Sequence, residues 1–252
     1  AAAFEDSEVV IAYGSDAAIE SIRARVPPGV RFVGHGHRLS LAVIGRETLA
    51  YDSVESLAER LAYDVSLFDQ QGCVSPHVVY VERGGTIAPQ EFAESLAQAM
   101  AAFERDMPRG RLSVEETSAI QQARTEAELR ELREEPVRLF ASPGRTAWTV
   151  IYEDDPAFVP SCLNRVVRVK PLLDLGELPN LLRPVSRHLQ TVGAALSRER
   201  RDRLADALAP LGVCRVCPIG EMPHPPLHWH HDGGFNLLPL LKWTAIEDPA
   251  EG

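Results

Sequence analysis

Long apolar runs, basic excess and abundant cysteine are all missing from this sequence of 252 residues. Its 26 basic side chains stand against 36 acidic ones, and the formal net charge of −10 argues against a nucleic-acid partner, because binding phosphates needs a basic surface. No apolar stretch reaches the roughly 18 residues of a membrane span. The first residues, AAAFEDSEVVIAYGS, lack the basic start and the cleavage pattern of a signal peptide.

Four cysteines in a chain of this length do not make a disulfide framework, so a reducing cytoplasm is the expected location. Hydrophobic residues make up 45% and charged residues 25%, which is typical of a globular protein with a sizeable core. The length allows one large domain or two small ones. Because the first residue is not Met, we expect a processed chain or a piece of a longer protein.

Short apolar runs alternate with amphipathic stretches along the chain. Strands are predicted within 9–12, 31–36, 39–44, 77–82, 147–153, 164–172 and 213–219, and helices within 16–25, 51–69, 89–107, 113–135 and 197–212. The strands at 9–12 and 39–44 are expected to be buried, and Ser15 or Asp16 is expected to cap the first helix. This alternation predicts an α/β protein with a largely parallel sheet flanked by helices.

The clearest predicted helix lies within 51–69. Asp52 with Glu55 three residues later is typical of a capping box. One apolar stripe at helical spacing contains Val54, Leu57, Leu61, Val65 and Phe68.

Cys73 lies in a polar loop, FDQQGCVSPH, between this helix and the next strand. A structural cysteine normally lies among apolar neighbours, whereas this one follows two glutamines and a glycine. Either the cysteine is incidental, or the loop presents a thiol for chemistry such as acyl transfer. The preceding helix would present its C-terminal end, which does not favour a thiolate, so other groups must do so.

Two histidines, His35 and His37, lie in the glycine-rich segment GHGHRLSLAVI. They could serve in acid/base chemistry, or they could satisfy buried backbone groups. The Gly-x-Gly spacing is not a dinucleotide fingerprint, because Leu39 stands where the third glycine belongs.

A zinc site is a weaker interpretation of GVCRVCPIGEMPHPPLHWHHDGG. Cys214 and Cys217 have Cys-x-x-Cys spacing, but VCRVCPI is typical of a strand, which would place the two side chains on opposite faces. The histidine spacing fits no common finger, and we predict no metal. Gly14 and Ser15, at a turn from strand to helix, are a candidate phosphate contact.

In order along the chain, YGSDAAIESIR, GHGHRLSLAVI, FDQQGCVSPHVVYVERG, SCLNRVVRVKPL, LQTVGAAL and GEMPHPPLHWHHDG resemble the long-chain acyl-CoA reductase family (LuxC type), part of the aldehyde dehydrogenase superfamily. The Phe-Asp-to-Cys-x-Ser segment is also similar to that of the acylating aldehyde dehydrogenases. The resemblance implies an aldehyde dehydrogenase-like fold.

The resemblance also implies roles for particular residues. Cys73 would accept the acyl group of an acyl-CoA, and NADPH would reduce the thioester to a fatty aldehyde, with nearby N–H groups stabilising the oxyanion. Gly14 and Ser15 match the element beside the cofactor. Hydrolytic relatives carry a glutamate in the segment where Val33–Gly45 here has no acid, so His37 becomes the candidate for proton transfer. His35 and His77 are weaker candidates for substrate contact or proton transfer.

The family builds its cofactor site mainly from a half that would precede this chain. We therefore expect residues 1–32 to be the tail of a nucleotide-binding domain and residues 33–252 to be the catalytic domain. A homo-oligomer is expected, with acyltransferase or acyl-protein synthetase subunits as further partners. The alternatives are a cysteine-dependent acyltransferase or thioesterase that needs no nicotinamide, and a non-catalytic module of the same fold.

Overall fold

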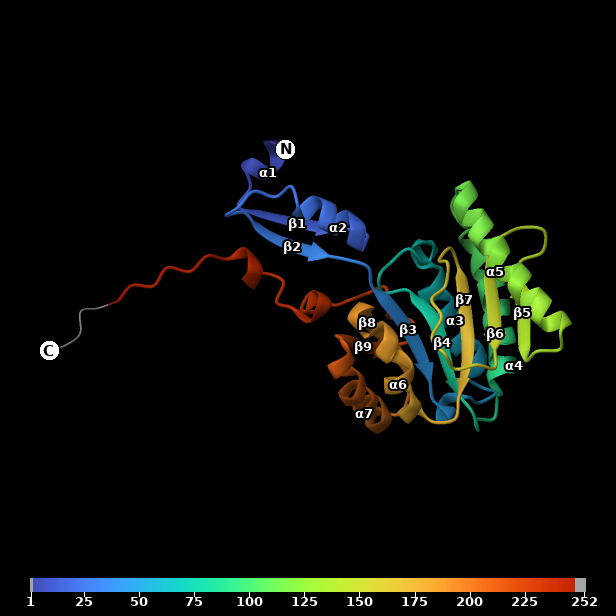
Figure 1. Ribbon diagram of the computed structural model, residues 1–252. Coiled ribbons are helices and arrows are strands. Elements are labelled where there is room, and N and C mark those ends of the chain that lie inside the picture. Colours follow the sequence, from blue (N-terminus) through green and yellow to red (C-terminus); the bar gives the residue numbers. More distant parts are fainter. Residues whose placement is uncertain (1, 248–252) are drawn as a thin grey trace. The chain divides into compact units, whose positions relative to one another are not determined.

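The computed structural model describes residues 2–247 (Figure 1). It consists of two compact units: one joins the residues up to His37 with those from His230 on, and the other is Arg38–Trp229. No helix in residues 2–247 is both long enough and apolar enough to cross a membrane.

The first unit is built on two parallel strands, β1 (Val9–Tyr13) and β2 (Arg31–His35), joined by helix α2 (Asp16–Arg23) and preceded by a short helix α1 (Ala2–Glu5). Ser15 is the N-cap of α2, as predicted, and its hydroxyl accepts the N–H of Ala18. The prediction that β1 is buried is wrong for most of the strand. Ala12 is buried, but the side chains of Ile11 and Tyr13 are largely exposed, because one short helix covers little of a two-stranded sheet.

The C-terminal stretch belongs to the first unit because β2 binds it. The Arg31 guanidinium donates hydrogen bonds to three consecutive carbonyls, those of Pro239 (2.9 Å), Leu240 (2.9 Å) and Leu241 (2.6 Å). Lys242 adds an ion pair with Glu8. One arginine therefore fastens a stretch about 200 residues further along the chain.

The second unit contains a seven-stranded sheet in the order β5-β6-β7-β4-β3-β8-β9. The strands are β3 (Leu39–Ile44), β4 (Pro76–Glu82), β5 (Val137–Ala141), β6 (Thr149–Glu153), β7 (Val166–Leu172), β8 (Leu189–Ala195) and β9 (Arg215–Pro218). Every pair is parallel except β5 with β6, so the predicted largely parallel sheet is confirmed. β5 and β8 were not anticipated, because their apolar residues are interrupted by Arg138 and by Gln190, Thr191 and Gly193.

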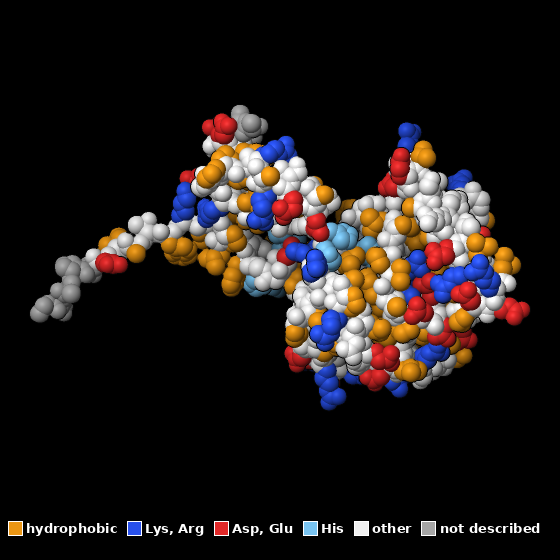
Figure 2. Space-filling model, in the orientation of Figure 1, with side chains coloured by type: hydrophobic (Ala, Val, Ile, Leu, Met, Phe, Trp, Pro, Cys, Tyr) orange, Lys and Arg blue, Asp and Glu red, His pale blue; other side chains and the backbone are white. Residues whose placement is uncertain are grey.

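Helices cover both faces of this sheet (Figure 1). Alternate residues of the central strands pack on α3 (Val54–Ser66) and α4 (Pro89–Asp106) on one face. The residues between them pack on α6 (Leu178–Leu182) and α7 (Arg198–Leu208) at one end of the other face, and α5 (Val114–Leu132) covers β5 and β6. The face of this unit visible in Figure 2 carries interleaved acidic and basic side chains.

Short 3-10 turns connect several of these elements. They lie at Arg46–Thr48, Leu67–Gln70, Leu175–Glu177, Arg183–His188, Ala209–Leu211, His231–Gly233 and Leu238–Leu240.

Two predictions about the helix within 51–69 are wrong at its ends. The N-cap is Ser53 rather than Asp52, and no side chain caps the helix there. The helix stops at Ser66, so Phe68 lies outside it, with 71% of its surface exposed. Val54, Leu57, Leu61 and Val65 are buried as the apolar stripe requires.

Candidate active site

Cys73 lies near the amino-terminal end of β4, in the loop that follows α3. It is exposed, unlike the other three cysteines. Burial raises the pKa of the Cys162 thiol, and it raises that of Cys217 to about 12. Cys73 is therefore the cysteine that is open to a substrate from solution.

The backbone before Cys73 is strained. Phe68, Asp69 and Gln70 are three consecutive non-glycine residues in the left-handed region, with φ of 52°, 53° and 64°. Such residues cost on the order of 1–3 kcal/mol each and persist where the surroundings enforce them. Gln70 shows the enforcement: its buried amide donates to the carbonyls of Pro76 and Val166 (both 2.8 Å) and accepts the N–H of Val166 (2.9 Å).

A second strained segment lies against the first. Leu163, Asn164 and Arg165 precede β7 and have φ of 64°, 58° and 63°. The Asn164 side chain accepts a hydrogen bond from Gln71 (3.0 Å), and the Arg165 guanidinium forms an ion pair with Asp69 (2.7 Å). The segments 68–71 and 163–165 therefore contact each other directly before the cysteine loop.

Ser40 fixes the cysteine residue itself. Its buried hydroxyl donates to the carbonyl of Cys73 (2.7 Å) and accepts the N–H of Thr191 (3.2 Å). The register of β3 against β4 and against β8 shifts beside Ser40, and bulges of this kind are frequent next to active sites. The cysteine loop is thereby bound to β3 and, through Ser40, to β8.

His77 lies within β4 at this register shift and is only 4% exposed. Its Nδ1 is 3.3 Å from the hydroxyl of Ser161, which also accepts the N–H of Leu163. This burial favours a structural role for His77 over direct contact with a substrate.

His35 and His37 both belong to the first unit. His37 is exposed, and its backbone N–H donates to Asp16 (2.9 Å). His35 is partly buried, with Nδ1 2.8 Å from a carboxylate oxygen of Asp232. Sequence patterns did not single out Asp232, because 197 residues separate it from its partner.

His35, His231 and Asp232 form the group of possible metal ligands found in residues 2–247. The two imidazole rings are stacked, with centroids 4.3 Å apart and planes within 5°, and Tyr13 stacks on His35 at 4.6 Å. Ring nitrogens coordinate a metal in the plane of the ring, so stacked parallel rings cannot both point at one ion. The absence of a metal here stays a prediction.

Cys217 lies in β9, and Cys214 directly precedes that strand. The Cys214 thiol donates to the carbonyl of Gln190 (3.5 Å), while Cys217 is buried. This arrangement follows from the alternation of side chains along a strand.

Gly14 and Ser15 lie where β1 turns into α2. Both are exposed, and the N–H of Gly14 donates to the carbonyl of His35 (3.1 Å). The Ser15 hydroxyl is engaged in capping the helix. Phosphate groups bind at helix N-termini of this kind, and a phosphate contact at Gly14 and Ser15 stays a prediction.

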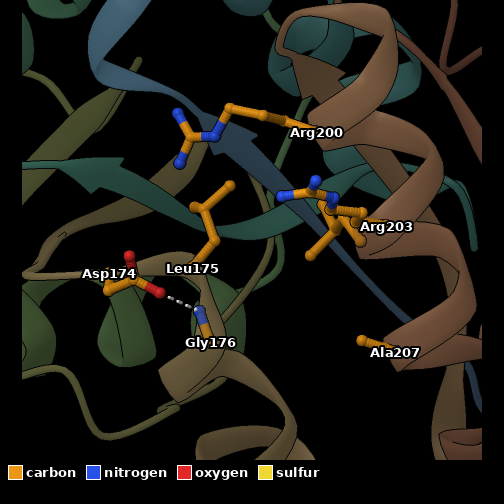
Figure 3. Close-up of a pocket in the computed structure, with 7 residues that line it drawn as sticks. Asp174, Leu175, Gly176, Arg200, Arg203 and Ala207 are labelled. Atoms are coloured by element: carbon orange, nitrogen blue, oxygen red, sulfur yellow. Dashed lines mark hydrogen bonds between the residues drawn. The ribbon is translucent and has the colours of Figure 1, made fainter.

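A cavity of about 260 Å³ lies at the opposite end of the sheet, beside the carboxyl-terminal ends of its parallel strands (Figure 3). It is lined by Asp174, Leu175, Gly176, Arg200, Arg203, Leu204 and Ala207. Arg200 forms an ion pair with Glu82, the last residue of β4, whereas Cys73 lies before the first residue of that strand. The cavity and Cys73 are therefore at opposite ends of β4. The cavity contains none of the residues predicted to be functional, so we assign it no part in the chemistry.

The acyl-CoA reductase (LuxC) family model matches residues 1–243. The chain belongs to this family. It is 27% identical to a long-chain acyl-protein thioester reductase of Aliivibrio fischeri over 96% of its own length, and 26% identical to long-chain acyl-protein thioester reductase 2 of Photobacterium leiognathi over 97%. It spans 47% and 48% of these relatives, about half their length.

The fold is that of the aldehyde dehydrogenases. The aldehyde dehydrogenase KauB from Pseudomonas aeruginosa matches 84% of this LuxC-family chain with a TM-score of 0.64 and 15% identity, over 44% of its own length. The 1-pyrroline-5-carboxylate dehydrogenase of Thermus thermophilus matches 91% with a TM-score of 0.60 and 14% identity, over 47% of its length. The predicted family and fold class are both confirmed.

Proposed function

We propose that this chain carries the acyl-accepting cysteine of a fatty acyl thioester reductase. The observation that carries the proposal is the exposed Cys73, on a strained and anchored loop, in a chain of the acyl-CoA reductase (LuxC) family. In a protein of the relatives' length, NADPH would reduce the acyl-enzyme to a fatty aldehyde. Cysteine suits this task because a thioester is more reactive towards nucleophiles and hydride than an ester.

The first half of the reaction needs only a thiol and a thioester. The Cys73 thiolate attacks the carbonyl carbon of the donor, the carbon–sulfur bond of the donor breaks, and the donor leaves as a thiolate that takes up a proton. We propose acyl-CoA as the donor. An acyl group on a protein thiol would react in the same way, and acyl-protein thioesters stand in the names of the relatives.

Acylation is tested by incubating the chain with a long-chain acyl-CoA and measuring its mass. The expected result is one added acyl group, which hydroxylamine removes because it cleaves thioesters. An unchanged mass with every acyl-CoA, and with an acylated carrier protein, would leave the non-catalytic module as the better interpretation.

The second half of the reaction needs a nicotinamide cofactor, and the residues of this chain fit it only in part. Gly14 and Ser15 are exposed at the start of α2, where a phosphate could be bound. A dinucleotide site of the usual kind is built from several βαβ units, and the first unit contains two strands. The described residues of the first unit therefore do not by themselves make a dinucleotide site.

NADPH is expected to bind this chain weakly, with a Kd above about 1 mM, while acylation of Cys73 proceeds in its absence. The reason is that one helix N-terminus supplies few of the contacts that a dinucleotide needs. Titration followed by the fluorescence of NADPH measures the affinity, and the acylated mass is read in parallel. Saturable binding in the micromolar range would contradict this expectation.

The acyl-enzyme is expected to hydrolyse slowly and to release its acyl group quickly to CoA. A hydrolytic enzyme needs a carboxylate within hydrogen-bond reach of the attacking water. Residues 33–45 contain no acidic residue, and His35 and His37 are the only other candidate bases there. We propose His37 for proton transfer, so His37→Ala should slow acylation without speeding hydrolysis. Release of a radiolabelled acyl group with and without CoA measures both rates.

Equal release of free fatty acid in both arms would instead support the thioesterase alternative.

A homo-oligomer, acyltransferase or acyl-protein synthetase partners, and a cytoplasmic location remain part of the proposal. Sedimentation of the chain at several concentrations tests the first of these.

A further inference from the structure

The residues just before Cys73 and just before β7 brace each other. Phe68–Gln70 and Leu163–Arg165 are each left-handed throughout, which is unusual for residues other than glycine. Neither run is stable by itself, because a left-handed backbone crowds the side chain against the following carbonyl. Something must hold both in place.

Side-chain contacts between the two runs stabilise both of them. Asp69 contacts Arg165 through an ion pair of 2.7 Å, and its second carboxylate oxygen accepts the N–H of Gly110 (3.0 Å). The Gln70 amide binds the backbone of Val166, directly after the second run. Asp69 with Arg165 and Gln70 with Val166 therefore join the two segments.

Arg165 is the fixed member of this arrangement. Its side chain is 3% exposed and also binds the carboxylate of Glu104 (2.6 Å) and the carbonyl of Met107 (3.0 Å). The guanidinium lies over the ring of Phe103, 5.3 Å from its centroid. Contacts from α4 therefore define where Asp69 must lie, four residues before Cys73.

We propose that Asp69 and Arg165 are a positioning pair that sets the direction of the Cys73 thiol for attack on a thioester. This inference rests on the proposed function of Cys73. The pair does not touch the reacting atoms; it holds the strained backbone from which the cysteine loop starts. A shift of about 1 Å at such a residue is enough to slow a reaction about a hundredfold, because attack on a carbonyl demands a defined approach.

The test compares Asp69→Gly with Asp69→Asn. Glycine accepts the left-handed backbone but makes no anchor, whereas asparagine tolerates the same backbone and keeps an oxygen for Arg165. Arg165→Lys, which replaces the two guanidinium nitrogens that bind Asp69 and Glu104 with a single ammonium, is a second variant in case Asp69→Gly does not fold. Glu199→Gln, in the exposed pair with Arg203, is the matched control.

Two rates are measured for each variant, acylation of Cys73 by acyl-CoA and its alkylation by iodoacetamide across pH. We expect Asp69→Gly to slow acylation at least about tenfold, and Asp69→Asn and Glu199→Gln to stay within about threefold of the wild type. Alkylation, which depends on exposure and thiolate fraction more than on direction, should change by less than about threefold.

Wild-type acylation by Asp69→Gly and by Arg165→Lys would overturn the positioning pair and leave the proposed function intact. An equal loss of acylation and alkylation would also overturn it, because the thiol would then have become inaccessible rather than misdirected. A wild-type chain that takes no acyl group would remove the proposed function and this inference together.

Discussion

Replacing Cys73 with alanine should reduce the uptake of an acyl group from acyl-CoA by at least about a thousandfold. The thiolate is the attacking form, burial raises the pKa of the Cys162 thiol, and the Cys214 thiol donates to the carbonyl of Gln190. With its pKa raised to about 12, the buried Cys217 has about one thiolate in 10⁵ at pH 7. Tandem mass spectrometry of the acylated peptides locates the group.

Serine at Cys162, Cys214 or Cys217 provides the matched controls, and each variant should be acylated at the rate of the wild type. Acyl label on any of these three residues in the wild type, with none on Cys73, would contradict the assignment. Circular dichroism of Cys73→Ala should show an intact fold, because the side chain removed is exposed.

Replacing Glu82 with glutamine should lower the free energy of unfolding by about 3 kcal/mol at pH 7. The Glu82 carboxylate is fully buried and accepts hydrogen bonds from two guanidinium groups, those of Arg46 (2.7 Å) and Arg200 (2.7 and 2.9 Å). A neutral amide removes the negative charge and keeps one acceptor oxygen instead of two, so at least one guanidinium N–H would then face an N–H donor. Urea denaturation followed by circular dichroism measures the loss, with Glu199→Gln as the control.

The same carboxylate should make the loss depend on pH. These two arginines hold the pKa of Glu82 at about 2 against the burial that raises it, below its ordinary value of 4.5. A lowered folded-state pKa stabilises the protein above the unfolded-state value, and the contribution disappears as the pH falls towards 2. The difference between wild type and Glu82→Gln should therefore shrink by about 2 kcal/mol between pH 7 and pH 3. A difference that is equal at both values would contradict the assignment.

Local patterns were enough to predict most of the sheet and the place of Cys73. Five of the seven strands of the second unit show an apolar run or alternation, and the polar loop between a helix and a strand identified the candidate nucleophile. β8 was not predicted because Gln190, Thr191 and Gly193 interrupt its apolar residues, although the strand is buried between β3 and β9.

The surroundings of Cys73 could not be predicted in the same way. Helical periodicity continues through Phe68, yet contacts of Asp69 with Arg165, 96 residues away, turn the backbone left-handed there. The contact between His35 and Asp232 is likewise set by residues distant in sequence. Pattern analysis reports local preference, and these features depend on tertiary contacts that override it.

The strand order has a consequence for how the chain folds. β3 lies in the middle of the sheet between β4, which follows it closely in sequence, and β8, which begins 150 residues after β3 starts. During synthesis β3 to β7 can pair while β8 is still unmade, leaving one side of β3 as an open edge. Closing that seam is costly in chain entropy, so it belongs to the slow part of folding. A growing chain arrested before Leu189 would expose the β3 edge, and this is the stage at which pairing with another chain is most dangerous.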